Sequence, residues 1–492
     1  MGVVKTPGRR KGRVKNKITC PHCWHVFDLE NLLAIAAHPD LRGDEVLGSE
    51  AQQRFRPSHF SPDCKAIDAR GEECPDLACP RCHLIIPRGL TRKNPIFLSI
   101  VGAAASGKTY LLTAMVRELR NSMYREFGFS FGDADNLSNE PLHDCEKMLF
   151  GNPDDDQFVQ LQKTQRRGSM HDQISLDGLE VWLPRPLMFS LEGQPHHPWY
   201  KKKRDQLEQL LIVYDNAGED FYEGSDSTTA PVTRHLVRSS GILFVFDPCQ
   251  DKEFQRLCRS SDPQMAIYDV RRQDQLLSEA IHRIERHSDR HSSAARERPL
   301  IVVVNKYDVW HELLDLQRLP DPWVRSDSLP TTGLNRDSIA VVSFAIRNLL
   351  LDVCPALVDR AESFSKQVTY LPASPLGHSP MQIIGEESDG DQAQFMQSSL
   401  QVRPADIDPV WATVPLLYML AQLKLIPVFP SKRAQKLPVA QDCRRSGDML
   451  TLTVPGTSET LWVPDRYLGC PLRAPESKKL FRLPAENEMS GQ

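Results

Sequence analysis

The sequence predicts an α/β fold with a mostly parallel sheet, preceded by a small cysteine-rich module. Continuous apolar segments of strand length recur along the chain and alternate with segments of helical pattern, as in parallel sheets covered on both faces. These apolar segments are residues 96–101, 209–214, 241–246 and 300–304. In addition, six of the 12 cysteines lie within the first 82 residues. This clustering sets the start of the chain apart from the rest.

Length and composition favour several folded units. The chain has 492 residues, whereas single domains cluster near about 100 to 150 residues. Hydrophobic residues make up 40% and charged residues 25%, which is ordinary for globular proteins and excludes wholesale disorder. The longest apolar stretches are of strand length, so no transmembrane segment is expected and we predict a cytoplasmic protein. A formal net charge of -4 argues against a polyanion-binding role for the whole chain.

Residues 1–17 form a basic arm that is predicted to be a flexible tail. Its cations are Lys5, Arg9, Arg10, Lys11, Arg13, Lys15 and Lys17. No apolar segment follows them, so the arm is not a secretory signal. Met1 to Thr6 also fits the pattern of N-myristoylation, for which a basic cluster is the usual second membrane signal, but this pattern is short and permissive and we interpret the match as a coincidence. Contact of the arm with nucleic acid stays open.

Residues 18–88 form the cysteine-rich module, for which two CxxC turns predict a structural zinc site. Cys20 and Cys23 frame Pro-His, and Cys79 and Cys82 frame Pro-Arg. Four thiolates complete a tetrahedral zinc shell with no open position, so the metal is expected to be structural and not catalytic. A reducing compartment makes ligation more plausible than disulfides. A redox role for one CxxC pair is the alternative.

Between the two turns, the sequence predicts a short helix over residues 28–37. Cys64 and Cys74 have two interpretations, a second metal site completed by His59 or His83, or ordinary thiols. Ribbons of this kind usually dock onto a protein or a nucleic acid, and the pattern does not choose between them.

The strand at residues 96–101 leads directly into a Walker A sequence, followed by a helical stretch at 110–120. Glycine backbone amides in such a loop surround phosphates at a helix N-terminus, the lysine reaches the β- and γ-phosphates, and the threonine binds Mg²⁺. The residues predicted to contact the nucleotide here are Gly102, Ser106, Gly107, Lys108 and Thr109.

Two further motifs follow predicted strands in chain order. Residues 209–214 lead into Asp215-Asn-Ala-Gly218, a DxxG motif whose carboxylate holds Mg²⁺ through water and whose glycine amide senses the γ-phosphate. Residues 300–304 lead into Asn305-Lys306-Tyr-Asp308, an NKxD motif whose aspartate accepts two hydrogen bonds from guanine. Because all three motifs follow strands of a parallel sheet, we expect them at one ligand-binding edge.

With these motifs, residues 95 to about 425 resemble the TRAFAC (translation-factor-related) class of P-loop GTPases. The arrangement CPHC, CPRC, GAAASGKT, DNAGED and NKYD looks most like the double-GTPase-type domains of bacterial conflict systems that carry an N-terminal zinc ribbon. Only one complete motif set is present, so "double" does not describe this chain. The resemblance implies a P-loop GTPase fold that binds GTP or GDP with Mg²⁺.

The resemblance also implies a switch threonine that ligates Mg²⁺, for which Thr164 is the candidate; a surface-loop threonine is the alternative. Ser374 aligns with the serine of the last motif, although Pro375 then replaces a residue whose amide contacts guanine, so the amide of Leu376 would substitute. Glu219 stands where Ras-like members have a water-orienting glutamine. Its charge beside the γ-phosphate predicts slow hydrolysis. The predicted catalytic residues are Lys108, Thr164 and Glu219.

Other segments are predicted to surround the core. Residues 131–205 form a long insertion in the switch region, 263–290 a solvated helix, and 410–425 a packed helix that closes a GTPase domain at 95–428. The extension at 429–492 contains a predicted hairpin of residues 449–454 and 459–463.

The sequence therefore leads us to expect a GTP-binding, slowly GTP-hydrolysing molecular switch with a zinc-ribbon docking module and a protein partner or effector. The alternative is a non-hydrolysing guanine-nucleotide-binding scaffold or adaptor. An ATPase or kinase would require the NKxD match to be accidental.

Overall fold

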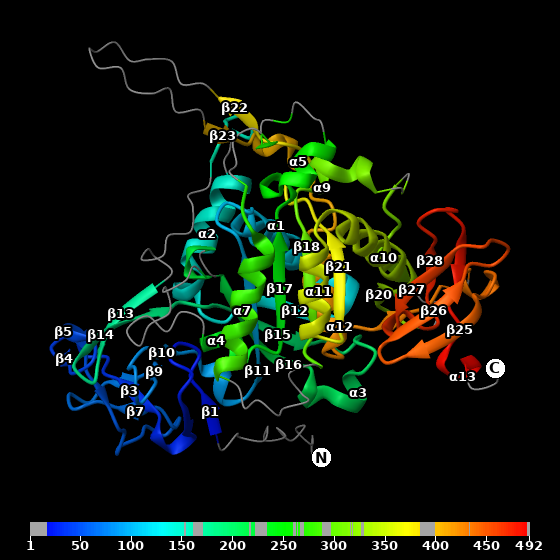
Figure 1. Ribbon diagram of the computed structural model, residues 1–492. Coiled ribbons are helices and arrows are strands. Elements are labelled where there is room, and N and C mark those ends of the chain that lie inside the picture. The colour runs from blue at the N-terminus through cyan, green and yellow to red at the C-terminus, as the bar shows by residue number, and fades with distance from the viewer. Residues whose placement is uncertain are drawn as a thin grey trace, which may run out of the picture.

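The structure is a computed structural model that describes residues 17–151, 154–160, 171–215, 218–221, 234–258, 262, 264–265, 270–287, 297–314, 316, 318–325, 329–383, 399–431 and 433–489. Its central element is a sheet of seven strands (Figure 1). In spatial order these are β12 (Phe129–Asp133), β15 (Leu187–Gly193), β16 (Glu208–Asp215), β11 (Asn94–Gly102), β17 (Gly241–Phe246), β18 (Leu300–Val304) and β21 (Val368–Pro372). The protein is thus of the mixed α/β class.

The strand directions indicate that a ligand would bind at the carboxyl ends of the parallel strands of this sheet. Five adjacent strands are mutually parallel: β16, β11, β17, β18 and β21. The other two are antiparallel to their neighbours, β15 to β16 and β12 to β15. After β11 the chain forms β12, β15 and β16 on one side of β11 and then crosses to β17 on the other side. Such a reversal of strand order marks the place where open α/β sheets bind ligands, outside the carboxyl ends of the strands.

The two faces of the sheet bury alternate residues of each strand, as the period of two requires. In β16, Leu211 and Val213 point to a core shared with α1 (Lys108–Ser122) and α12 (Val414–Gln422). Leu210, Ile212 and Tyr214 point to the opposite face. Since both faces are covered, these strands are continuously apolar in the sequence.

Helices cover both faces. α1 and α12 confirm the helices predicted at 110–120 and 410–425. On the other face, α7 (Gln273–His287), α10 (Arg336–Val353) and α11 (Pro355–Phe364) pack over β17, β18 and β21. α7 lies inside the predicted solvated helix, but its Leu277 and Ile281 are buried, so one side of it belongs to the core. None of the described helices combines the length and apolar character needed to cross a membrane.

The cysteine-rich module covers the remaining part of that second face, next to β16. A four-stranded sheet, β10-β9-β3-β6, is its largest element. The predicted helix at 28–37 is wrong: the chain forms a 3-10 turn at Leu29–Asn31 and then strand β3 (Leu33–Ile35). β3 pairs with both β9 (Leu77–Ala78) and β6 (Arg54–Phe55). Pairing on both sides outweighs the local helical pattern.

The insertion predicted at 131–205 contributes to the main sheet. It supplies most of β12, all of β15, helix α2 (Asn136–Phe150) and the hairpin of β13 (His171–Leu176) and β14 (Leu179–Pro184). The hairpin reaches the cysteine-rich module, where Ser175 N donates to Val46 O at 3.0 Å. The insertion is therefore more than an enlarged loop.

The C-terminal residues form a small β unit beside α10, coloured orange to red in Figure 1. Strands β25 (Gln441–Ser446), β26 (Met449–Thr453) and β27 (Thr460–Pro464) form an antiparallel sheet, which confirms the predicted hairpin. Its core includes Leu452, Val463 and Leu472, and Phe344 of α10 packs into the same cluster.

We predict that Phe344→Ala destabilises the protein by about 3–5 kcal/mol, because it removes a buried ring shared by α10 and the C-terminal unit. Leu351→Ala, on the same helix but 37% exposed, is the matched control and should cost about 1 kcal/mol or less. Chemical denaturation of both variants measures the difference. Equal losses would show that Phe344 does not join the two units.

Candidate functional site

The loop between β11 and α1 is shaped by two glycines that no other residue replaces without strain. Gly107 has a φ of +81°, and a Cβ there would lie 2.7 Å from Asn305 Nδ2. A Cβ on Gly102 would lie 2.5 Å from the carbonyl oxygen of Val245. The loop therefore packs directly against the ends of β17 and β18, as expected for a loop that presents its backbone to a ligand.

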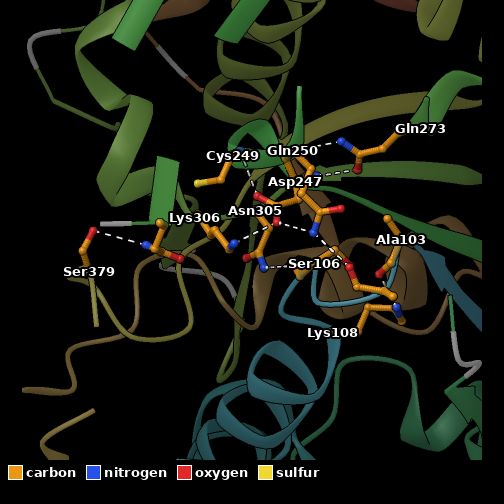
Figure 2. Close-up of polar contacts among 12 residues, drawn as sticks. Ala103, Ser106, Lys108, Asp247, Cys249, Gln250, Gln273, Asn305, Lys306 and Ser379 are labelled. Atoms are coloured by element: carbon orange, nitrogen blue, oxygen red, sulfur yellow. Dashed lines mark hydrogen bonds and ion pairs between the residues drawn. The ribbon is translucent and has the colours of Figure 1, made fainter. Parts of the chain in front are cut away.

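Lys108 is the first residue of α1, and its side chain folds back onto this loop. Its Nζ donates to the carbonyl oxygens of Gly102, at 2.9 Å, and Ala103, at 2.8 Å (Figure 2). Ser106 Oγ is buried and has no hydrogen-bond partner among the described residues. A buried cation held by carbonyl dipoles, next to a buried hydroxyl, forms a site suited to an anion.

Asp215 ends β16, opposite Ile100 of β11. Its Oδ1 is buried and has no hydrogen-bond partner among the described residues. Burial raises the pKa of this carboxyl to about 6, although the nearby Lys108 ammonium opposes the shift. A carboxylate in this state is a good ligand for a divalent cation, which would supply the missing compensation.

Gly218 brings the DxxG segment against the loop. A Cβ at this position would lie 2.1 Å from Ala104 N, so only glycine allows the approach. Asn216 and Ala217 lie outside the described residues, as do Thr164 and the side chain of Glu219. The roles predicted for Thr164 and Glu219 therefore stay predictions.

Asn305 joins the segment 305–308 to the loop. Its Nδ2 donates to Ser106 O at 2.9 Å, and its Oδ1 is buried without a partner among the described residues. Trp310 Nε1 donates to Asn305 O at 2.8 Å and fixes the backbone beyond β18. Lys306 follows in the left-handed region, with a φ of 54°. The structure thus brings residues 102–109 and 305–308 together at one edge of the sheet.

Asp247 is a site residue that the sequence interpretation missed. It directly follows β17 and is fully buried, and its Oδ2 forms an ion pair with Lys306 Nζ at 2.7 Å (Figure 2). Gln250 Nε2 donates both to Asp247 Oδ2, at 3.0 Å, and to Ala104 O, at 2.9 Å. Gln273 exchanges two hydrogen bonds, each of 2.8 Å, with the backbone of Asp247. The position of Asp247 after an apolar strand, like the positions of Asp215 and Asn305, is the sequence feature that could have identified it as a site residue.

Asp308 and Ser374 are in direct contact. Ser374 Oγ donates to Asp308 Oδ1 at 2.5 Å, and Gly377 N donates to Ser374 Oγ at 2.8 Å. Burial raises the pKa of Asp308, while the Ser374 hydroxyl opposes that shift. Tyr307 N donates to Ala373 O at 3.0 Å, which ties the two loops together.

The four cysteines of the CxxC turns form a single cluster, with Sγ atoms that all lie within 4.8 Å of one another. Cys20 and Cys82 Sγ are 3.7 Å apart, as are Cys23 and Cys79 Sγ. Zinc–sulfur bonds of about 2.3 Å in a tetrahedron give sulfur separations of about 3.8 Å, so the cluster has the dimensions of a zinc site. Burial raises the pKa values of Cys20 and Cys82, and a cation is what stabilises buried thiolates.

The two turns have the same backbone geometry. Cys20 N donates to His25 O and Cys79 N to Leu84 O, while the amides of His22 and Arg81 each reach a cysteine sulfur at 3.4 Å. The second metal site considered for Cys64 and Cys74 does not form: His83 instead bonds Asp44, and the described residues contain no other ligand group of this kind.

The cysteine-rich module contacts the strand that carries Asp215. Tyr214 OH donates to Pro21 O at 2.5 Å and lies 3.1 Å from Trp24 Nε1, which donates to it. The Tyr214 ring also stacks on His235 of α4 (Arg234–Arg238), with ring centroids 4.4 Å apart, and Trp24 contacts both rings. The module therefore packs directly on the strand that ends in Asp215.

These residues define a mixed α/β protein whose polar groups converge at the carboxyl edge of its sheet. No family model matches the chain. It is 27% identical over 175 residues, 35% of its length, to the Mycolicibacterium smegmatis (strain ATCC 700084 / mc(2)155) protein named "Putative ESX-1 scaffolding and assembly protein SaeC". The chain spans 38% of the length of that curated relative.

Two solved structures show a weaker similarity. One is Sup35 complexed with GDP, at 9% identity and a TM-score of 0.20, covering 57% of this chain and 38% of that one. The other is the GTPase-like domain of S. cerevisiae Ski7 bound to GTP, at 11% identity and a TM-score of 0.24, covering 75% of this chain and 58% of that one. Scores at this level do not establish a shared fold.

We predict that Asp215→Asn stabilises the nucleotide- and magnesium-free protein above pH 6. The pKa of Asp215 is about 6 in the fold and about 3.9 in an unfolded chain, so ionisation opposes folding. This cost is absent below pH of about 4 and complete above about 6, where removing it should add up to about 3 kcal/mol. Chemical denaturation across this pH range tests it, with exposed Asp144→Asn as the control. A gain confined to low pH would contradict burial as the cause.

Proposed function

We propose that this protein binds guanine nucleotides with Mg²⁺ at the carboxyl edge of its sheet and acts as a slowly GTP-hydrolysing switch of the TRAFAC class. The observation that carries this proposal is the hydrogen bond from Asn305 Nδ2 to Ser106 O. It connects a motif suited to a base with a loop suited to phosphates, so a single nucleotide can contact both. The narrower likeness to GTPases of bacterial conflict systems and a cytoplasmic location belong to the same proposal.

The site residues have different roles in nucleotide binding. The loop 102–109 would bind the phosphates, and Thr109 and Asp215 would bind the Mg²⁺ that neutralises charge on the β- and γ-phosphates. Asp308 accepts hydrogen bonds from guanine, and Ser374 holds that carboxylate in place. Lys306, fixed by Asp247, offers its side-chain stem to the base. Thr164 is the candidate switch threonine, and Glu219 in place of glutamine accounts for slow turnover.

We also propose that Cys20, Cys23, Cys79 and Cys82 bind a structural zinc ion. The sulfur distances and the repeated turn geometry support it. Because the module packs on Tyr214 and His235, its first docking partner is the nucleotide domain of the same chain. A further protein partner or effector would use the surface that remains.

The second candidate function is a scaffold that holds guanine nucleotide without hydrolysing it. Glu219 favours it, as does the name of the relative, which describes a scaffolding and assembly protein. The two candidates share the binding site and differ only in turnover, so one experiment distinguishes them.

We expect guanine-selective binding when the purified protein is titrated with fluorescent GDP, GTP and ATP analogues in Mg²⁺. Asp308→Asn should shift preference to xanthine nucleotides, because an amide donates where the carboxylate only accepts. Phosphate release from bound GTP is expected to be slow. Guanine binding without any release would favour the scaffold, and a preference for ATP would exclude both candidates.

For the metal, we expect one zinc per chain in the wild type, measured by elemental analysis, and its loss in Cys79→Ser. Without zinc, buried thiolates lose their counter-charge and the thermal midpoint should fall by several degrees. Cys64→Ser changes an exposed cysteine and should retain both zinc and stability. A metal-free wild type with the same thermal midpoint before and after chelation would refute the zinc site.

A further inference from the structure

The carboxylate of Asp308 lies close to two serine hydroxyls. Ser374 Oγ donates to Oδ1. Ser379 Oγ lies 3.3 Å from Oδ2 and comes from the segment that follows β21. In Figure 2, Ser379 lies beyond Lys306 as seen from Lys108, on the side where the base is expected.

The proton of the Ser379 hydroxyl is directed away from Asp308. Ser379 Oγ makes a much shorter contact with Asp262 Oδ2, and a hydroxyl has only one hydrogen to donate. Gln264 Nε2 donates to Ser379 Oγ at 3.2 Å, and Gln264 N donates to Asp262 Oδ1 at 2.9 Å. Gln264 is itself buried. These contacts hold the serine oxygen with one lone pair still available, next to the acceptor oxygen of Asp308.

Two acceptor oxygens 3.3 Å apart suit a group that donates to both. Guanine carries three N–H donors on one edge, one at N1 and two on the 2-amino group. Asp308 has two oxygens, so it takes the N1 hydrogen and one amino hydrogen. The second amino hydrogen still needs an acceptor, and leaving it unsatisfied in a closed site costs affinity.

We propose, on the basis of the guanine site proposed above, that Ser379 Oγ accepts the second hydrogen of the guanine 2-amino group. Ser379 is then a specificity-determining residue that selects 2-aminopurines over hypoxanthine, whose C2 carries no amino group. Asp262 and Gln264 are positioning residues, because they set the direction of the serine proton. Without Asp262 the proton would turn toward Asp308 and compete with the base.

The test compares GDP with IDP, which lacks only the 2-amino group, by displacement of a fluorescent nucleotide from the full chain. Ser379→Ala should lower the GDP affinity by about three- to tenfold and leave the IDP affinity unchanged. Asp262→Ala should also reduce the preference for GDP over IDP. Ser379→Thr retains the hydroxyl and should preserve the wild-type ratio.

Glu312→Gln is the control, since it removes an exposed carboxylate from the turn His311–Leu313 after the base-reading motif. It should leave both affinities unchanged. Equal losses of GDP and IDP affinity in Ser379→Ala, or no loss, would overturn the role of Ser379 while guanine binding stands. If the wild type binds neither GDP nor IDP, the proposed guanine site fails first, and this inference fails with it.

Discussion

The hydrogen bond between Asn305 and Ser106 is the contact on which the rest of the site depends. It joins the ends of two strands that lie on opposite sides of β17. Gly107 makes the approach possible, because a side chain there would clash with Asn305 Nδ2. Since both residues are buried, removing the Asn305 side chain would leave the Ser106 carbonyl oxygen unsatisfied, at a cost of about 1–3 kcal/mol. The loop between β11 and α1 and the segment 305–308 are therefore held in a fixed relation by the protein itself.

The same edge is stabilised by charge as well as by hydrogen bonds. Asp247 and Lys306 form a buried ion pair, and Cys249 N and Gln250 Nε2 also donate to the carboxylate. Removing one partner of such a pair costs about 3–5 kcal/mol, because the other charge remains buried. Gln250 Nε2 also donates to Ala104 O, which connects the Asp247–Lys306 ion pair to the loop between β11 and α1. Asp247 thereby positions both Lys306 and, through Gln250, the loop between β11 and α1.

Sequence motifs predicted which segments would meet at this edge of the sheet. The loop after β11, the end of β16 and Asn305 after β18 lie there because parallel strands bring their carboxyl ends to one edge. Asp247 has the same position but no motif, since its role arises from Lys306, 59 residues further along the chain. The strand at Leu33–Ile35 was mistaken for a helix because its partners come from residues 54–55 and 77–78. Contacts between distant segments are what local patterns do not contain.

The packing of the cysteine-rich module has a mechanical consequence for Asp215. Tyr214, its neighbour in β16, is bonded to Pro21 inside the first CxxC turn and stacked on His235. His235 is in turn bonded to Ser99 of β11 at 2.7 Å. A shift of the end of β16 would break the bond to Pro21 and leave buried polar groups unsatisfied. The four-cysteine cluster, by fixing Pro21 between Cys20 and Cys23, therefore opposes movement of the carboxylate that the proposed switch would use.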